Sequence, residues 1–249
     1  MIPNAVSRRV LFCAGVLLLS GSGVSLNLHA AELCHRPPPQ TLIAWYNHTH
    51  PQNPLHYDPK NSAIYHPISI LRSQQPSAYW IGLAWLAPTS GALFAIECNG
   101  SVIDASPVGA IGKLSPGPVL PELGETVMPV YVSRESRDCV HDSIQIAALK
   151  DNKIMVVWQH GYNQGLNVTA QGKLKNFIAE NYTLTAADGG LTLRLSGERA
   201  TYAYLEDGSQ ASVPFKTQSL EAETWHWDAG KLRFVPEKAY RSSPACTPK

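Results

Sequence analysis

Five histidines lie close together near the start of the chain, and imidazole is a frequent protein ligand for transition metals. They are His35, His48, His50, His56 and His66. Residues i and i+2 of a strand point to the same face, so His48 and His50 could present both rings to one Zn²⁺ or Cu²⁺, with His56 or Asp58 completing the shell. We therefore predict His48, His50 and His56 as candidate metal ligands. The alternative is a proline-rich surface segment that happens to contain many histidines.

Aromatic residues concentrate in the same region and just after it: Trp45, Tyr46, Tyr57, Tyr65, Tyr79, Trp80 and Trp85. Exposed Trp and Tyr rings bind sugars, peptides or other flat groups at a small cost in side-chain entropy. The same rings would equally fill a core between the N-terminal segment and a β-sheet. Both interpretations stay open, and the sequence identifies no cofactor.

Linear signatures of hydrolases are absent from residues 31–249. The segment contains no Gly-x-Ser-x-Gly, no His-Glu-x-x-His and no Ser-x-x-Lys. His141, Asp142 and Ser143 are the three residue types of a serine-hydrolase triad, but adjacent residues of a strand point in alternating directions. We interpret them as the entrance of a strand. No catalytic residue is predicted, which favours a protein that is not an enzyme.

The stretch Ser143–Trp158 predicts the element around which the chain is organised. Its two apolar runs, Ile144–Leu149 and Ile154–Trp158, flank a polar tetrad that contains Asp151 and Asn152. Asp and Asn tolerate the left-handed backbone of a tight turn, so this pattern predicts a β-hairpin. Four further hairpins are expected around Asn99-Gly100, Asp188-Gly189-Gly190, Asp207-Gly208 and Asp228-Ala229-Gly230.

The hairpins predict an all-β, antiparallel domain with propeller-like or meandering sheets, and a β-sandwich or open barrel is the alternative. Within it, the apolar run Ala92–Ile96 predicts a strand buried on both faces. Eight prolines in residues 35–76 predict an irregular N-terminal lid, with a possible first strand at Thr41–Tyr46. The Gly- and Pro-punctuated residues 106–129 predict a long surface connection. Residues 172–181 are the one helical candidate.

Residues 1–30 match an export signal. Arg8 and Arg9 precede a short apolar run, Val10–Leu19, and Leu28-His29-Ala30 is a suitable cleavage site. The run is too short to span a membrane, and Ser7–Phe12 also resembles the twin-arginine export motif. The expected organisation is a signal at 1–30, an irregular segment at 31–77 and a β-rich domain at 78–249. The expected destination is the periplasm or the outside of the cell.

Four cysteines remain after the signal, which removes Cys13: Cys34, Cys98, Cys139 and Cys246. An even number in an oxidising compartment predicts two disulfides, for which three connectivities exist. We favour Cys34–Cys246, which would tie two proline-rich ends together, and Cys98–Cys139. No Cys-x-x-Cys spacing indicates a redox motif or a zinc site.

The net charge of the mature chain argues against polyanions as partners and excludes no other class of soluble partner. Without the signal, the chain has 18 basic residues (20 − 2) and 19 acidic residues (19 − 0), which give a net charge of −1. Nucleic acid is therefore not an expected partner. No second apolar run is long enough to span a membrane. The sequence favours an exported, disulfide-stapled bacterial envelope protein that binds a protein or small-molecule ligand without catalysis. A periplasmic hydrolase with residues converging from loops, or a periplasmic metal-binding protein, is the alternative.

Overall fold

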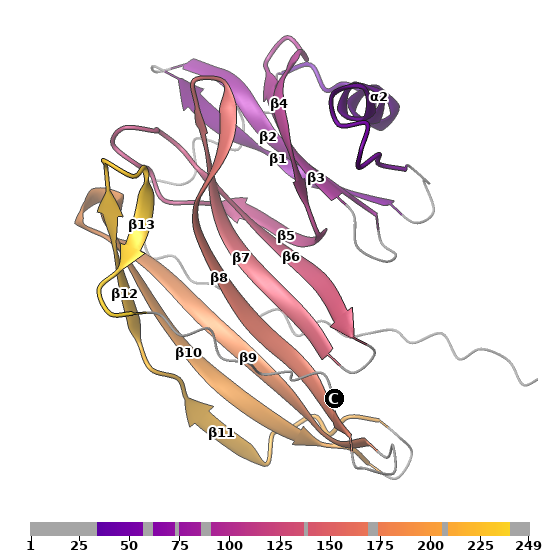
Figure 1. Cartoon of the computed structure of the whole chain (residues 1–249), viewed down its shortest axis with the longest axis vertical. Helices are drawn as coiled ribbons and strands as arrows, with labels where there is room; N and C mark the ends of the chain where they lie inside the picture. The colour runs from indigo at the N-terminus through magenta and orange to yellow at the C-terminus, as the bar shows by residue number, and fades with distance from the viewer. Residues whose placement is uncertain are drawn as a thin grey trace, which may run out of the picture.

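A computed structural model describes residues 34–56, 62–72, 75–85, 91–136, 139–168, 174–205 and 209–239. Within these ranges the fold is antiparallel β structure with a single α-helix, and the sheets do not close into a barrel (Figure 1). The predicted all-β fold of meandering sheets is confirmed. No helix of the described residues is long and apolar enough to cross a membrane.

The first sheet is a four-stranded meander in the order β1-β2-β3-β4. Its strands are β1 (Ser62–Arg72), β2 (Gln75–Trp85), β3 (Gly91–Glu97) and β4 (Val102–Val108). Helix α2 (Pro39–Thr49) packs on one face of this small sheet. The helix, the sheet and the segment before the helix share one core, which contains Leu42, Tyr46, Tyr79 and Phe94.

The second sheet has nine strands in the order β13-β12-β10-β9-β8-β7-β6-β5, and β11 also pairs with β10. Its strands are β5 (Ala110–Pro116), β6 (Val127–Ser136), β7 (Cys139–Lys150), β8 (Lys153–Val168), β9 (Leu174–Ala187), β10 (Thr192–Ala203), β11 (Lys216–Ser219), β12 (Glu223–Asp228) and β13 (Arg233–Pro236). A short 3-10 helix, η2 (Asp188–Gly190), joins β9 to β10. Each consecutive pair from β5 to β10 is antiparallel.

The small sheet packs on the large one, so several strands are buried on both faces. In β3, Ala92, Phe94 and Ile96 face helix α2, whereas Leu93 and Ala95 face the large sheet. The predicted two-sided burial of Ala92–Ile96 is thereby confirmed. In strands, alternate residues point to opposite faces, which explains why this segment has no polar residue.

Strand β7 repeats this two-sided burial in the large sheet. Ala147 and Leu149 pack toward the small sheet, and Ile146 and Ala148 pack into a third core on the opposite face. That third core also contains Trp158 of β8 and Trp225 of β12, whose rings meet edge to face at 6.0 Å between centroids. The large sheet therefore rolls over itself, and we call the enclosed face its inner face.

The N-terminal segment differs from the prediction. Thr41–Tyr46 lies in helix α2 rather than in a strand, and residues 62–72 form β1 rather than irregular structure. Proline is tolerated in the first helical turn, where its missing N–H has no intrahelical acceptor, so Pro39 is compatible with a helix start. Leu42 and Tyr46, four residues apart, bury the same helical face.

Residues 106–129 are also more regular than predicted, because β5 occupies Ala110–Pro116 and pairs with β6. Residues 174–187 form β9, so the helical candidate at 172–181 is a strand over its described part. The turns follow the sequence: Asp151 and Asn152 have φ of 49° and 60° in the β7–β8 hairpin, as a primed two-residue turn requires. Asp207-Gly208 lies outside the described residues.

The disulfide pairing predicted from the sequence is wrong. Cys34 bonds to Cys98, with their Cα atoms 4.5 Å apart, which excludes both Cys34–Cys246 and Cys98–Cys139. The backbone supports this bond, since the N–H of His35 donates to the carbonyl oxygen of Cys98 at 2.9 Å. The side chain of Cys139 and the whole of Cys246 lie outside what the structure describes.

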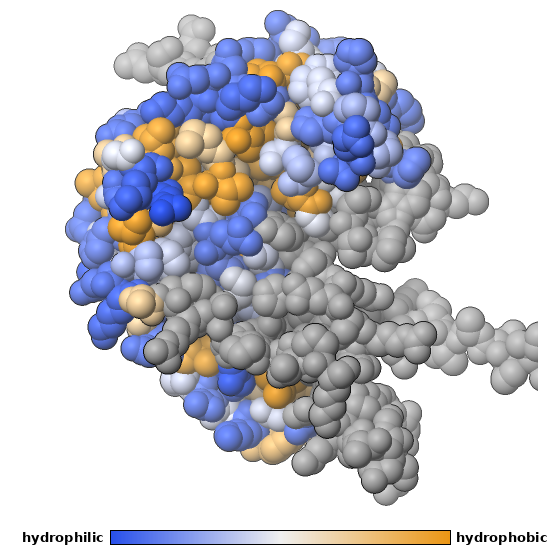
Figure 2. Space-filling model, viewed as in Figure 1, coloured by the Kyte–Doolittle hydropathy of each residue, from blue (hydrophilic) through white to orange (hydrophobic). Residues whose placement is uncertain are grey.

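In the view of Figure 2, hydrophobic residues gather over the region where the upper part of β8 approaches β13 and the connection before β6. The large apolar side chains exposed in the described residues include Val119 at 59% and Val156 at 44%. Most of the remaining coloured surface is polar.

Asp104 of β4 links the small sheet to the β7–β8 hairpin, and its replacement tests that link. Its carboxylate is nearly buried and accepts the N–H of Ile154 at 2.8 Å and Lys153 Nζ at 3.1 Å. Asp104→Ala should lower the free energy of unfolding in urea by about 1–3 kcal/mol, because the Ile154 N–H loses its carboxylate acceptor. The control Lys153→Ala should cost less than about 1 kcal/mol, since the lysine side chain is 76% exposed. Equal effects of the two variants would contradict this role.

Candidate functional site: the polar half of the inner face

The inner face of the large sheet changes from apolar to polar along each of five strands. On β8 the side chains of Trp158, His160 and Tyr162 share this face, as i, i+2 and i+4 residues must. Their partners on β7 follow the same order, because Ile146 pairs with Trp158 and Asp142 pairs with Tyr162. The inner face of β8 therefore becomes polar one residue pair before that of β7, because His160 pairs with Ile144.

The strands on the other side of the roll make the same change. On β9, Leu184 is followed toward the polar side by Tyr182 and Glu180, and the register pairs Glu180 with Arg199 of β10. On β12, Trp225 is followed by Glu223. We call the polar part of this surface the polar half of the inner face: Asp142, His160, Tyr162, Glu180, Tyr182, Arg199 and Glu223.

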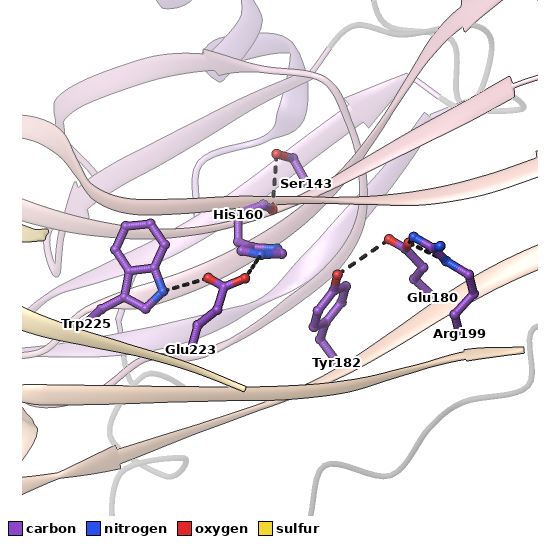
Figure 3. Close-up of polar contacts among 7 residues, drawn as sticks. All are labelled: Ser143, His160, Glu180, Tyr182, Arg199, Glu223 and Trp225. Atoms are coloured by element: carbon purple, nitrogen blue, oxygen red, sulfur yellow. Dashed lines mark hydrogen bonds and ion pairs between the residues drawn. The ribbon is translucent and has the colours of Figure 1, made fainter. Parts of the chain in front are cut away.

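His160 and Glu223 connect the two sides of the roll although 63 residues separate them. Nε2 of His160 lies 3.2 Å from Oε1 of Glu223, and the indole N–H of Trp225 donates to Oε2 of the same carboxylate at 3.0 Å (Figure 3). The imidazole is almost completely buried, with 1% of its side chain exposed, against 25% for Glu223. The Trp225 indole, on the same strand, thus holds the carboxylate of Glu223 in place, and the His160 ring contacts that carboxylate from the other side of the roll.

Glu180 of β9 and Arg199 of β10 form a second polar group on the same face, farther from the apolar core. The guanidinium of Arg199 donates from Nε to Oε1 of Glu180 at 3.0 Å and also from Nη2. The Tyr182 hydroxyl donates to Oε2 of Glu180 at 3.5 Å (Figure 3). Glu180 is 1% exposed, and burial of a carboxylate is costly unless it is paired and hydrogen-bonded.

Aromatic rings lie between these polar groups. The rings of His160 and Tyr182 meet at 4.7 Å between centroids, and those of Tyr162 and Tyr182 at 6.1 Å. Burial, the charge of Asp142 and a hydrogen bond with Asp142 raise the pKa of the Tyr162 phenol, in that order of importance. Tyr162 therefore stays a neutral hydrogen-bond donor to Asp142 at physiological pH.

Ser143 lies on the opposite face of the sheet from His160. Ile144 is the register partner of His160, so Ser143 points the other way, where its hydroxyl accepts from Nε2 of Gln159 at 3.1 Å and donates to the carbonyl oxygen of His160 at 3.4 Å. The adjacent Asp142 belongs to the inner face. The structure thus separates Asp142 from Ser143, as the alternation of a strand requires.

The three histidines predicted as metal ligands lie at and after the end of helix α2, not on a strand. His48 and His56 are exposed, and the His50 ring stacks on Tyr46 at 4.4 Å while its Nδ1 lies 2.9 Å from the Thr49 hydroxyl. On a helix, residues i and i+2 point about 200° apart, so the same-face argument for His48 and His50 is wrong. Among the described residues no group of three His, Cys, Asp or Glu could hold a metal ion. Metal binding by these histidines stays a prediction.

The aromatic residues near the N-terminus occupy cores where they are described. Tyr46, Tyr79 and Trp80 are fully buried, and Trp45 is partly buried against the same core as Tyr46. The Tyr79 hydroxyl donates to the carbonyl oxygen of His35 at 2.7 Å, and burial raises the pKa of its phenol. Tyr57 and the side chains of Tyr65 and Trp85 lie outside the described part.

Comparison with known proteins finds no protein-family model and no curated protein that matches the chain. The polar half of the inner face was not predicted from the sequence either. The available signal was the alternation of Trp158, His160 and Tyr162 within a strand, where the buried face would be expected to be apolar throughout. The partners Glu180, Arg199 and Glu223 come from strands that only the roll brings to His160.

Gly197 provides a test of the aromatic packing in the polar half. It pairs with Tyr182 across β9 and β10, and a Cβ at this position would lie 2.6 Å from Cδ1 of the Tyr182 ring and 2.9 Å from the carbonyl oxygen of Asn181. Gly197→Ala should displace the ring and lower the free energy of unfolding by about 1–3 kcal/mol.

The matched control is Gly230→Ala, where the nearest atom to the added Cβ is Oδ1 of Asp228 at 3.4 Å. It should change the stability by no more than about 0.5 kcal/mol. Urea denaturation checks both values, and proton NMR checks whether the Tyr182 ring signals move. Equal stability of the two variants with unmoved ring signals would refute the packing.

Proposed function

We propose that this chain is an exported envelope protein that binds a ligand on the polar half of the inner face and does not catalyse a reaction. The observation that supports the proposal is that five strands each change from apolar to polar side chains along the inner face, with changes that lie one residue pair apart where His160 pairs with Ile144 and Glu223 pairs with Leu195. A sheet that only needed a core would continue Trp158, Leu184 and Trp225 with further apolar residues.

The energetic cost of this surface supports a functional role. The side chains of Glu180 and His160 are almost completely buried, with 1% and 2% of the residue exposed. The buried ion pair of Glu180 with Arg199 is of a kind that is often no more stable than well-packed apolar residues of similar volume. Ligand sites combine apolar and aromatic walls with a few fixed polar groups. The rings of Tyr162 and Tyr182 supply the walls, and Glu223 and Arg199, which are partly exposed, supply the polar groups.

The placement of Ser143 favours binding over hydrolysis. An imidazole beside a carboxylate resembles the base of a hydrolase, and that base needs a nucleophile within about 3 Å of the ring. The hydroxyl next to His160 in the fold, that of Ser143, is on the other side of the sheet. The carboxylate of Glu223 also accepts a hydrogen bond from the Trp225 indole, so the His160 ring is not its only partner.

Export is supported by two independent features. Residues 1–30 have the charge and apolar pattern of a signal, and Cys34 and Cys98 are joined in a disulfide, a bond that persists mainly in oxidising compartments. The ligand is therefore expected to be a small molecule or a protein segment present in the cell envelope.

The binding proposal is tested with the mature chain, residues 31–249, in a thermal-shift screen. The panel contains neutral sugars, amino acids, short peptides, dicarboxylates and organic amines. A ligand that binds the folded state should raise the Tm in a saturable way. Glu223→Gln should weaken that ligand by about tenfold or more, because a charged hydrogen-bonding group at the site is lost.

The matched control is His226→Gln, since His226 is exposed and two positions from Thr224 on the same strand, on the face opposite Glu223 and Trp225. It should leave the affinity unchanged. A ligand that binds wild type and Glu223→Gln equally would place the site elsewhere. Turnover of a panel compound would contradict the non-catalytic part of the proposal.

A further inference from the structure

The charged side chains that β10 and its neighbours bring to the inner face are sorted by sign along the strand. Next to the apolar core, the register pairs Glu223 of β12 with Leu195 of β10. Arg199 lies four residues farther along β10 (199 − 195 = 4) and points to the same face as Leu195. Because a strand rises about 3.3 Å per residue, the positions that carry the carboxylate and the guanidinium are about 13 Å apart along β10.

Lys216 of β11 adds a second cation at the Arg199 end. The register pairs Lys216 with Thr201 of β10, and directly opposed residues of an antiparallel pair share a face, so Lys216 lies on the same face as Arg199. Lys216 is exposed, and 30% of the Arg199 side chain is exposed. Glu180 is the carboxylate that is ion-paired with Arg199. The three side chains at this end therefore carry a net charge of +1 (2 − 1 = 1).

Glu223 is the negative group at the other end. Its side chain is 25% exposed, and the Trp225 indole and the His160 ring hold its carboxylate in one orientation. A carboxylate has about four lone-pair sites and accepts several hydrogen bonds. Glu223 is therefore suited to accept a hydrogen bond from a ligand ammonium group. Asp142, the third carboxylate of the polar half, lies across the roll beside Tyr162.

The ring of Tyr182 lies between the two charged ends. Tyr182 pairs with Gly197, which is midway between Leu195 and Arg199 on β10. A Cβ on Gly197 would lie 2.6 Å from Cδ1 of the ring, so the ring lies directly over this glycine. Figure 3 shows the ring between Glu223 and Arg199. Tyr182 is partly exposed, and an aromatic ring of this kind packs against an apolar part of a ligand.

We infer that the ligand of the polar half is an extended tripeptide with both termini free. Its ammonium group binds Glu223, its carboxylate binds Arg199 and Lys216, and its middle residue packs on Tyr182. A ligand stretched directly between the charges, with a hydrogen bond of about 3 Å at each end, would span about 7 Å, and one lying above both would span about 13 Å. Three extended residues span about 10 Å, between these limits. The inference rests on the proposed function and names the class of ligand.

A linear amino acid of similar length, such as ω-aminooctanoic acid, presents the same two charges. Its hydrocarbon chain rotates about every bond, whereas the planar amides of a peptide leave fewer torsions to be fixed on binding. The peptide also offers a middle side chain to the ring of Tyr182. Trialanine should therefore bind more tightly than ω-aminooctanoic acid.

Isothermal titration calorimetry of the same mature chain with trialanine at neutral pH tests the inference. Dialanine and tetraalanine should bind about threefold weaker or worse, because their termini do not match the separation of the charges. N-acetylation and C-terminal amidation should each weaken trialanine by about tenfold or more, since each removes a charged hydrogen-bonding group. Equal affinity for the free and the blocked peptides, or for trialanine and ω-aminooctanoic acid, would overturn the inference.

Protein variants assign each terminus of the peptide to its end of the site. In Glu223→Gln, acetylation should no longer weaken trialanine, whereas amidation still should. The double variant Glu180→Gln/Arg199→Gln removes both partners of the buried ion pair, and amidation should then weaken trialanine by about threefold or less. The control Arg194→Gln replaces an exposed arginine on the opposite face of β10 and should keep both effects. Unchanged effects of the two blocking groups in both test variants would overturn the assignment.

Failure of this inference is distinguishable from failure of the binding proposal. A sugar, dicarboxylate or amine that binds through Glu223, with trialanine inactive, would keep the binding proposal and overturn the peptide as its ligand. If neither the panel nor the peptides bind, the binding proposal fails and the inference with it. The Tm of each free variant checks its folding, and the blocked peptides with wild type decide the question if the double variant does not fold.

Discussion

The segment Ile146–Leu149 of β7 buries alternate side chains in two different cores, and the layered arrangement depends on this two-sided burial. Ala147 and Leu149 close the core shared with the small sheet, while Ile146 and Ala148 close the core inside the roll. A strand buried on both faces has to be apolar at every position. The run from Ile144 to Leu149, interrupted only by Gln145, meets that requirement.

Toward the start of β7, the inner face no longer consists of apolar residues. Beyond Ile144 toward the start of β7, the inner face continues with Asp142 rather than with an apolar residue. Strand β8 changes one residue pair earlier, from Trp158 to His160, which pairs with Ile144. On the opposite side of the roll the change falls between Leu184 and Tyr182. The apolar part of the inner face forms the core of the roll, and the polar part is the surface for which we propose ligand binding.

Local signals predicted the local structure. Turn residues such as Asp151 and Asn152 occupy positive φ, and the apolar run Ala92–Ile96 is buried on both faces, because both properties follow from a few neighbouring residues. Helix α2 was missed because prolines dominate its surroundings, although proline is compatible with a first helical turn. The Cys34–Cys98 pairing could not be derived, since spacing alone does not choose among connectivities. The site was missed for a related reason: Glu223 meets His160 only through the roll of the sheet.

The roll of the large sheet is tested most directly by nuclear Overhauser effects in the protein with labelled aromatic rings. The ring centroids of His160 and Tyr182 are 4.7 Å apart, and those of Trp158 and Trp225 are 6.0 Å apart in an edge-to-face contact. Cross-peaks between the ring protons of both pairs are expected, because these contacts join β8 to β9 and to β12. Absence of both sets of cross-peaks, while the β7–β8 hairpin shows its backbone contacts, would contradict the roll and with it the shared inner face.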